Sequence, residues 1–352
     1  MIRNNKDNSI TAFVFYSTFS NGYKSKRLKY LKENLPSSFI YNFEKNDPEQ
    51  NVFKVPLVFF IIKLSSKLFS KKNNQYLRIF CEQLFYFLSI FVILKHHKRI
   101  KTIVAQPRSS LFNSFFVLLK IKVINEISEM SPVLWSQYAP GHPYFSSKIA
   151  QYFYLNALNK ASLSYCFSEA SMQSFNGLYK YKLCLVEPYP ETDDFYFDHN
   201  KNKNNPKDIL FIGEWSKYKG VELLIELASE LNLHVHHVGN INSEESLKYH
   251  NVTHYGYQIN TKQFIKDNIH NSLIGILPGS FEGFSRVYWD YKSLNLQVIG
   301  HPLFFKNLEI FDINNLSLIE ELLSSDKLSV NESIKIVKKQ KNAFLKSITE
   351  IL

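Results

Sequence analysis

Cysteine is scarce in this chain, and its placement excludes several kinds of site. Cys81, Cys166 and Cys184 are the three cysteines among 352 residues, and they lie far apart without a CxxC pair. Disulfide frameworks and structural zinc sites need cysteines at recurring, paired spacings. We therefore expect buried, unreactive thiols and a protein of a reducing compartment.

Long apolar runs are also missing. The longest, Val55–Ile62 and Leu84–Leu94, fall well short of the roughly 18–20 residues that span a bilayer as a helix. The first residues show neither the apolar core nor the small-residue cleavage site of a signal peptide. We expect a cytoplasmic protein that is free or peripheral on the inner face of the cytoplasmic membrane.

Positive charge is concentrated in the first third of the chain. Residues 1–120 carry 20 Lys and Arg against 6 Asp and Glu, whereas the whole chain carries 42 against 31. Within this part, Lys63, Lys67 and Lys71 recur every four residues, so 54–72 is predicted to form a basic amphipathic helix. Such a helix either packs on a core with a solvated lysine face or is drawn to an anionic membrane surface.

Nucleic acid is not expected as a partner. The basic residues alternate with long aliphatic runs instead of aromatic stacking platforms, and no RNA- or DNA-binding motif occurs. No internal repeat of a solenoid period is present either.

Strand patterns alternate with helix patterns along the chain, which predicts an α/β fold with mostly parallel sheets. The length favours two domains, divided near Pro188-Tyr-Pro190 and followed by a polar, Asn/Lys-rich loop or linker at 198–208. We predict an N-terminal Rossmann-like domain over 1–190 and a C-terminal one over 191–335, facing each other across a cleft. Residues 336–352 are predicted to form a helix that packs back toward the N-terminal domain.

The predicted strands are short runs of β-branched and aromatic residues bounded by turn residues. They are Ile10–Tyr16, Thr102–Ala105, Lys122–Asn125, Ala161–Ser168, Ile209–Gly213, His234–Gly239, Val252–Gly256, Leu273–Leu277 and Gln297–Gly300.

One candidate phosphate site lies in the segment Phe211–Leu224. A predicted strand ends at Gly213, and Lys219-Gly220 opens a predicted helix. Backbone N–H groups at a helix start attract phosphate, and a nearby lysine adds charge. Taken alone, this pattern also occurs by chance before ordinary helices.

A second candidate lies in Leu277–Asp290. A predicted strand leads into a turn rich in Pro and Gly, and small residues there let backbone amides approach an anion. Glu282 precedes the following helix, and Asp290 lies eight residues later, about 12 Å along a helix axis. That separation is too long for a retaining-glycosidase pair. The two carboxylates are predicted to hold hydroxyls at the ends of one elongated ligand.

This acid, the Gly-Phe that follows it and a second acid after seven intervening residues resemble the signature of the GT-B-fold retaining glycosyltransferases of family 4. The resemblance covers residues 205–305 well, and the N-terminal half loosely through Ile10–Gly22 and Ser164–Phe175. It implies that a sugar is transferred from a nucleotide-sugar donor to a saccharide or lipid-linked saccharide acceptor, without metal or cofactor. The expected setting is assembly of bacterial cell-surface polysaccharide, lipopolysaccharide, capsule or glycolipid. A non-catalytic sugar-nucleotide-binding protein and a sugar-nucleotide epimerase are the alternatives.

The resemblance also implies roles for individual residues. Lys219 would bind the donor diphosphate, Glu282 the hydroxyls of the donor sugar, and Asp290 the ribose. The implied catalytic set is Glu282, Lys219, Glu126 and His142. The implied donor-binding set is Gly22, Gly213, Lys217, Lys219, Tyr257, Glu282, Gly283, Phe284, Ser285, Arg286 and Asp290.

Three departures from the family pattern concern the site. Glu214 stands where the family often has an arginine for the diphosphate, and Lys217 or Arg286 could substitute for it. A histidine that the family often places after an N-terminal-domain strand is missing, which leaves Glu126, Glu129 or His142 as candidates. A glycine-rich turn is replaced by a segment that begins at His301.

Overall fold

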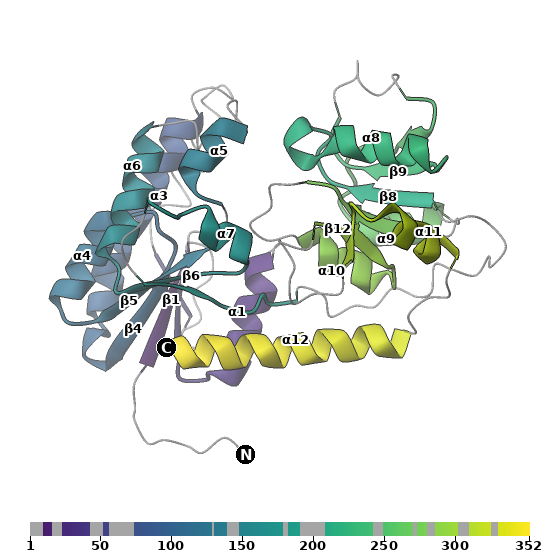
Figure 1. Cartoon of the computed structure of the whole chain (residues 1–352). Coiled ribbons are helices and arrows are strands. Elements are labelled where there is room, and N and C mark those ends of the chain that lie inside the picture. The colour runs from purple at the N-terminus through teal and green to yellow at the C-terminus, as the bar shows by residue number, and fades with distance from the viewer. Residues whose placement is uncertain are drawn as a thin grey trace. The chain divides into compact units, whose positions relative to one another are not determined.

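A computed structural model of the chain forms two compact units, each built on a parallel sheet (Figure 1). Unit 1 comprises Met1–Phe167, Ser171–Val186 and Leu345–Leu352, and unit 2 comprises Ser168–Ala170 and Glu187–Phe344. The structure describes residues 10–15, 23–42, 52–55, 74–128, 130–138, 148–178, 182–190, 208–241, 249–269, 273–279, 286–301, 310–324 and 330–352.

The described part of unit 1 contains a seven-stranded sheet in the order β3-β2-β1-β4-β5-β6-β7, and every neighbouring pair is parallel. Chain order therefore runs outward from β1 in one direction and from β4 in the other. The strands are β1 (Ile10–Val14), β2 (Phe39–Asn42), β3 (Val52–Lys54), β4 (Ile100–Ala105), β5 (Lys122–Ile127), β6 (Leu163–Cys166) and β7 (Leu183–Leu185).

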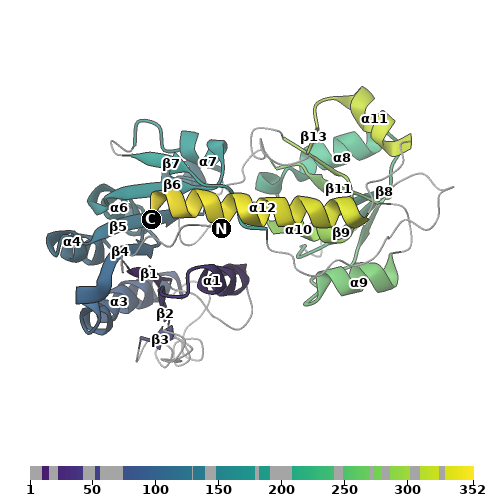
Figure 2. The ribbon, with the colours of Figure 1, turned by 90° about the horizontal axis from the view of Figure 1, so that it is seen from below.

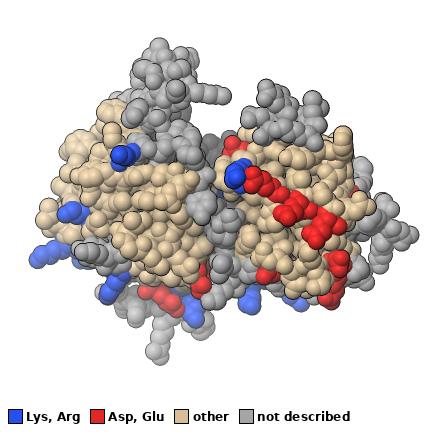
Figure 3. Space-filling model, turned by 45° about the horizontal axis from the view of Figure 1, so that its top comes forward, with Lys and Arg blue, Asp and Glu red and all other residues tan. Residues whose placement is uncertain are grey.

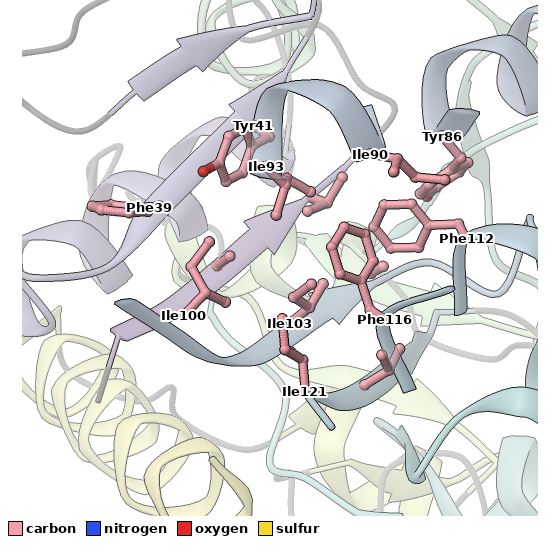
Figure 4. Packing of buried hydrophobic residues seen from close by; sticks show 14 of the residues in the cluster. Phe39, Tyr41, Tyr86, Ile90, Ile93, Ile100, Ile103, Phe112, Phe116 and Ile121 are labelled. Carbon is pink, nitrogen blue, oxygen red and sulfur yellow. The ribbon is translucent and has the colours of Figure 1, made fainter. Parts of the chain in front are cut away.

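Helices cover both faces of this sheet (Figures 1 and 2). Alternate residues of β1 point to opposite faces, so Ala12 and Val14 pack in the cluster formed with α3 and α4. Figure 4 shows Tyr86 of α3 and Phe112 of α4 in this cluster. Phe15, just after β1, contacts α1 instead. The helices are α1 (Tyr23–Asn34), α3 (Asn74–Leu94), α4 (Ser110–Leu118), α5 (Pro132–Tyr138), α6 (Lys148–Lys160) and α7 (Glu169–Gln173).

The described part of unit 2 contains a six-stranded sheet in the order β10-β9-β8-β11-β12-β13, again wholly parallel. This is the doubly wound order, in which successive strands run outward from the first and the fourth. The strands are β8 (Asp208–Ile212), β9 (Val235–Val238), β10 (Val252–His254), β11 (Leu273–Leu277), β12 (Val298–Gly300) and β13 (Phe311–Asp312).

Two apolar clusters lie on the two faces of the unit 2 sheet. Ile209 and Phe211 of β8 pack with α8 (Val221–Glu230) and α11 (Leu316–Ser324). Leu210, between them, packs with α9 (Thr261–Asn268) and α10 (Arg286–Ser293). Both faces are thus buried, which is why the strands are almost continuously apolar.

The C-terminal helix α12 (Val330–Ile351) contributes to both units. Val337 joins the unit 2 cluster that contains α9 and α10. Near the other end, Lys122 Nζ donates to the Ile351 carbonyl at 2.6 Å and Thr102 Oγ1 to the Leu352 carbonyl at 3.3 Å, both within unit 1. A single helix therefore carries the chain from one compact unit into the other.

The prediction of a helix over 54–72 is wrong at its start. Lys54 ends strand β3, paired with Asn42 of β2, and the Val55 N–H continues the ladder to the Asn42 carbonyl at 2.7 Å. The apolar β-formers Val52, Phe53 and Val55 favour this pairing over a helical turn. Residues 56–73 lie outside the described part of the chain.

Tyr291 of α10 reaches into the sheet where β8 and β11 separate. The two strands pair from Leu273–Asp208 as far as Gly275–Leu210. Beyond that point the Tyr291 hydroxyl accepts from the Ile212 N–H, and the Leu210 and Ile276 carbonyls lie within its donating reach, all at 3.0 Å. A Cβ on Gly275 would lie 2.5 Å from the Tyr291 ring. The Tyr291 ring can therefore occupy this position only because residue 275 has no side chain.

We predict that Tyr291→Phe lowers the free energy of unfolding by about 1–3 kcal/mol, because it leaves a buried N–H and buried carbonyls without their partner. Urea unfolding measures the change. Tyr41→Phe is the matched control: Tyr41 is equally buried, and its hydroxyl has no hydrogen-bond partner among the described residues (Figure 4). Equal costs for the two substitutions would contradict the role assigned to the Tyr291 hydroxyl.

Candidate functional site

The switch point of the unit 2 sheet brings the two predicted phosphate segments together. β8 and β11 are neighbours, but the chain leaves β8 toward α8 on one face and leaves β11 toward α10 on the other. In doubly wound sheets, ligands bind at the carboxyl ends of two such strands. The segments after them contain Gly213–Gly220 and Pro278–Asp290.

The two segments touch through glycine backbone. Gly220 has a φ of +78°, and a Cβ there would lie 2.3 Å from the Pro278 carbonyl oxygen. A Cβ on Gly279 would lie 3.4 Å from the Lys219 carbonyl oxygen. His301, directly after β12, adds a hydrogen bond to the Pro278 backbone. Lys219 is thereby held beside the turn that leads to α10.

Glycines also hold the end of β8 against its other neighbour. The Gly213 N–H donates to the Val238 carbonyl at 3.0 Å, and a Cβ on Gly239 would lie 1.7 Å from the Gly213 carbonyl oxygen. Trp215 then donates its N–H to the Asn240 carbonyl at 2.9 Å. The backbone from which the Lys219 loop departs is therefore closely fixed.

The one acid in the loop Gly213–Gly220 is Glu214, and it is hydrogen-bonded within the loop. The Tyr218 hydroxyl donates to the Glu214 carboxylate. Lys219 is half-buried, with Nζ 5.7 Å from the Tyr218 ring centroid. Lys217 is 84% exposed and lies 3.3 Å from Glu222 of α8. Of the two lysines, Lys219 is the one held next to the β11 turn.

Asp290 lies on α10, next to the anchoring Tyr291, and its carboxylate is partly exposed. Lys262 Nζ of α9 approaches Asp290 Oδ1 at 3.7 Å. Sequence reasoning missed Lys262, although a lysine in the first turn of the helix before β11 was a usable signal. Arg286 is exposed at the start of α10, and Tyr257, just after β10, is 69% exposed.

Several predicted site residues lie outside the described part of the chain, so their roles stay predictions. They are Gly22, Glu129, His142, Glu282, Gly283, Phe284 and Ser285.

Glu126 occupies a buried polar network at the carboxyl ends of strands in unit 1. Its Oε1 pairs with Arg27 at 2.7 Å, and its Oε2 accepts from the Tyr165 hydroxyl at 2.7 Å. The Arg27 guanidinium also lies 5.5 Å from the ring centroids of both Phe15 and Phe167. Because both carboxylate oxygens are engaged, this geometry favours a structural part for Glu126, and its catalytic role stays a prediction.

A pair of imidazoles, of which His237 is buried and His254 partly exposed, supports the end of β8. His237 Nε2 lies 2.9 Å from the Gly213 carbonyl oxygen, and its Nδ1 lies 2.8 Å from His254 Nδ1. A carbonyl can only accept, so Nε2 of His237 carries the hydrogen, and its Nδ1 accepts from His254. Burial lowers the pKa of His237 to about 4; the bond to Gly213 opposes this shift, and the charge of His254 adds to it.

Among the described residues, no three His, Cys, Asp or Glu side chains are grouped so that they could hold a metal ion. The metal independence that the family resemblance implies stays a prediction. Burial raises the pKa of the Cys166 thiol to about 12.

The two parallel-sheet units are those of the GT-B glycosyltransferase fold. A lipopolysaccharide outer core galactosyltransferase, WaaB, superposes with a TM-score of 0.63 at 13% identity, covering 97% of this chain and 100% of that one. The catalytic domain of starch synthase IV from Arabidopsis thaliana, bound to ADP and acarbose, gives 0.60 at 11%, covering 97% of each. Anabaena HepE with UDP and glucose gives 0.51 at 13%, covering 96% of this chain and 94% of that one. No family model and no curated protein sequence matches.

The contact at Gly220 yields a matched pair of substitutions. Gly256 also has a positive φ, +70°, but nothing lies within 4 Å of a Cβ placed there. We predict that Gly256→Ala costs about 1 kcal/mol, the price of a left-handed residue with a side chain. Gly220→Ala should cost about 2–4 kcal/mol, because the methyl group also forces the Pro278 backbone away. Urea unfolding measures both, and equal costs would show that the two loops do not touch.

His237 makes stability depend on pH in a defined direction. Its pKa is about 4 when folded and about 6.5 when unfolded, so the unfolded chain binds the proton first. Stability is complete above pH 6.5 and falls as the pH drops toward 4, by about 2 kcal/mol between pH 7.5 and 5. His237→Gln keeps a donor for the Gly213 carbonyl but does not titrate, so its unfolding free energy should fall less over this range. Identical pH slopes for both proteins would refute this.

Proposed function

We propose that this chain is a retaining glycosyltransferase of the family 4 type, which transfers a sugar from a nucleotide-sugar donor to a saccharide or lipid-linked saccharide. The observation that carries the proposal is the contact of Lys219-Gly220 with Pro278-Gly279 at the switch point of unit 2. It joins a lysine and the start of α8 to the first residues after β11, and these belong to the two segments to which the family resemblance assigns donor binding. The named neighbours support it: WaaB is a galactosyltransferase, and two structures contain ADP or UDP.

In the proposed reaction, the bond between the anomeric carbon and the donor phosphate breaks first, and the acceptor hydroxyl adds to the same face. Charge grows on the leaving diphosphate. Lys219 and the amides of 283–285 stabilise that charge, and a donor phosphate oxygen takes the proton of the acceptor. Asp290 holds the ribose hydroxyls, and Lys262, 3.7 Å from it, pairs with its carboxylate and orients it.

The proposed setting is assembly of a bacterial cell-surface polysaccharide or glycolipid at the inner face of the cytoplasmic membrane. The basic charge of residues 1–120 supports attraction to an anionic bilayer. Throughout the described residues, every helix is too short or too polar to cross a membrane.

We predict that one nucleotide class among UDP, GDP, ADP and CMP sugars raises the thermal unfolding midpoint of the chain, because a ligand that binds the folded state stabilises it. With that donor, Lys219→Ala should lower turnover about 10- to 100-fold through loss of a charge-assisted phosphate contact. Lys338→Ala, on the exposed side of α12, is the matched control and should behave as wild type.

The outcomes separate the alternatives. Stabilisation by a sugar nucleotide without transfer to any saccharide indicates a binding protein, and conversion to an epimeric sugar nucleotide indicates an epimerase. Unchanged turnover in Lys219→Ala would remove Lys219 from the site.

A further inference from the structure

Exposed apolar side chains are concentrated on three helices of unit 1. Thirteen large hydrophobic side chains are exposed among the described residues, and nine of them lie on α3, on α6 or on α4 and the residue after it. We call these nine the apolar face: Phe80, Phe87, Phe91, Leu111, Val117, Leu118, Leu119, Ile149 and Tyr152. Leu118, at 82%, is the most exposed of them. Soluble monomers rarely expose so many apolar side chains together.

The three helices lie side by side, so their outer surfaces adjoin (Figures 1 and 2). Tyr86 of α3 meets Phe112 of α4 with ring centroids 5.2 Å apart. Asn113 of α4 donates to the Ala157 carbonyl of α6 at 2.7 Å. Ile79 of α3 and Ala150 of α6 share one buried cluster. Within α3, Phe80, Phe87 and Phe91 follow each other at seven and four residues, which places them on one side of the helix.

The exposed charged side chains described between residues 74 and 163 are all basic. Exposed lysines stand at the ends of the helices: Lys95 after α3, Lys120 after α4, and Lys148 and Lys160 at the two ends of α6. The described acids between residues 74 and 163 are Glu82 and Glu126, 3% and 2% exposed. Figure 3 shows one side of unit 1 on which most of the coloured surface is neither basic nor acidic, with Lys and Arg scattered over its edges and Asp and Glu at its lower edge only.

We propose that the apolar face is a docking surface for an anionic lipid bilayer, into which its Phe, Leu, Ile and Tyr side chains insert while the lysines contact lipid phosphates. Aromatic side chains favour the headgroup level of a membrane, and each lysine near an anionic surface adds attraction. This proposal rests on the membrane association in the proposed function and locates that association on α3, α4 and α6. Sequence reasoning had instead assigned it to residues 54–72.

A second copy of the chain is the less favoured occupant. In a symmetric dimer the same patch would face itself, and lysines at the helix ends would meet lysines without an exposed acid on these helices to pair with them. A bilayer of anionic lipid presents negative charge to all of the lysines that surround the apolar face, which we call its rim.

The apolar part of the proposal is tested by vesicle co-sedimentation at low salt with the full chain. Vesicles contain phosphatidylcholine alone or equal parts of phosphatidylcholine and phosphatidylglycerol. Wild type should bind the mixed vesicles, and the triple variant Phe91→Ser, Leu118→Ser, Tyr152→Ser should bind at least about tenfold more weakly, because buried apolar area is lost. The control is Leu178→Ser with Ile259→Ser, which removes exposed side chains away from the apolar face and should bind as wild type.

The contribution of the lysines is tested with two triple variants that each remove three positive charges. Lys95→Gln, Lys120→Gln and Lys148→Gln together remove three charges from the rim, and each is expected to weaken binding about fivefold. Lys338→Gln, Lys339→Gln and Lys346→Gln remove the same charge from exposed positions of α12 and should have a far smaller effect. Equal losses in both triple variants would mean that net charge, rather than this face, governs binding.

Other readouts make each failure distinct. All variants should keep the wild-type unfolding midpoint, because the substituted apolar side chains on α3, α4 and α6 are more than half exposed. They should also keep the stabilisation by the donor nucleotide. Wild-type binding by the triple serine variant, or no binding of wild type to mixed vesicles, overturns the docking surface. Self-association that the triple serine variant abolishes assigns the face to a second copy. Vesicle binding without any donor stabilisation instead overturns the proposed function and leaves the docking surface in place.

Discussion

A single hydroxyl group sits where two neighbouring strands of unit 2 part, and the candidate site is built around that point. Past Gly275 and Leu210, the Tyr291 hydroxyl takes the place of the ladder between β8 and β11 and satisfies the backbone groups that the separation exposes. Parting strands leave polar backbone without partners, and a buried group of that kind is costly. The same residue ties α10 to the sheet, so the position of Asp290 on that helix follows from the position of Tyr291.

Beyond the ends of β8 and β11, the loops are held together by close contacts between backbone atoms rather than by side chains. Gly220 and Gly279 let the loops after β8 and β11 touch, and Gly239 lets the next loop reach the Gly213 carbonyl. The His237 ring also stabilises this contact, because its Nε2 donates to the same Gly213 carbonyl. The result is a closely fixed backbone beneath Lys219, which suits an anion that must be bound in one orientation.

Sequence reasoning predicted five of the six described strands of unit 2, because each is a local pattern, but it missed β13 and helix α11. Strand β11 was predicted at its observed bounds, Leu273–Leu277, and strand β8 within one residue at each end. The contacts that give the site its shape are between residues distant in the sequence: Tyr291 with Gly275, Lys262 with Asp290, Gly220 with Pro278. The periodicity and composition of a segment do not predict which distant residues it contacts. Strands β2 and β3 were missed for a related reason, since Phe39–Asn42 and Val52–Lys54 are too short to show a period and gain their stability from pairing with β1 and with each other.

The path of α12 has a consequence for how the protein is made. Unit 1 includes Leu345–Leu352, whose carbonyls accept hydrogen bonds from Thr102 and Lys122. Domains made on the ribosome generally fold in order from the N-terminus. Here the N-terminal unit stays incomplete until synthesis has passed residue 352, so unit 2 has all of its residues first. The order of completion is thus the reverse of the order in which the two sheets begin.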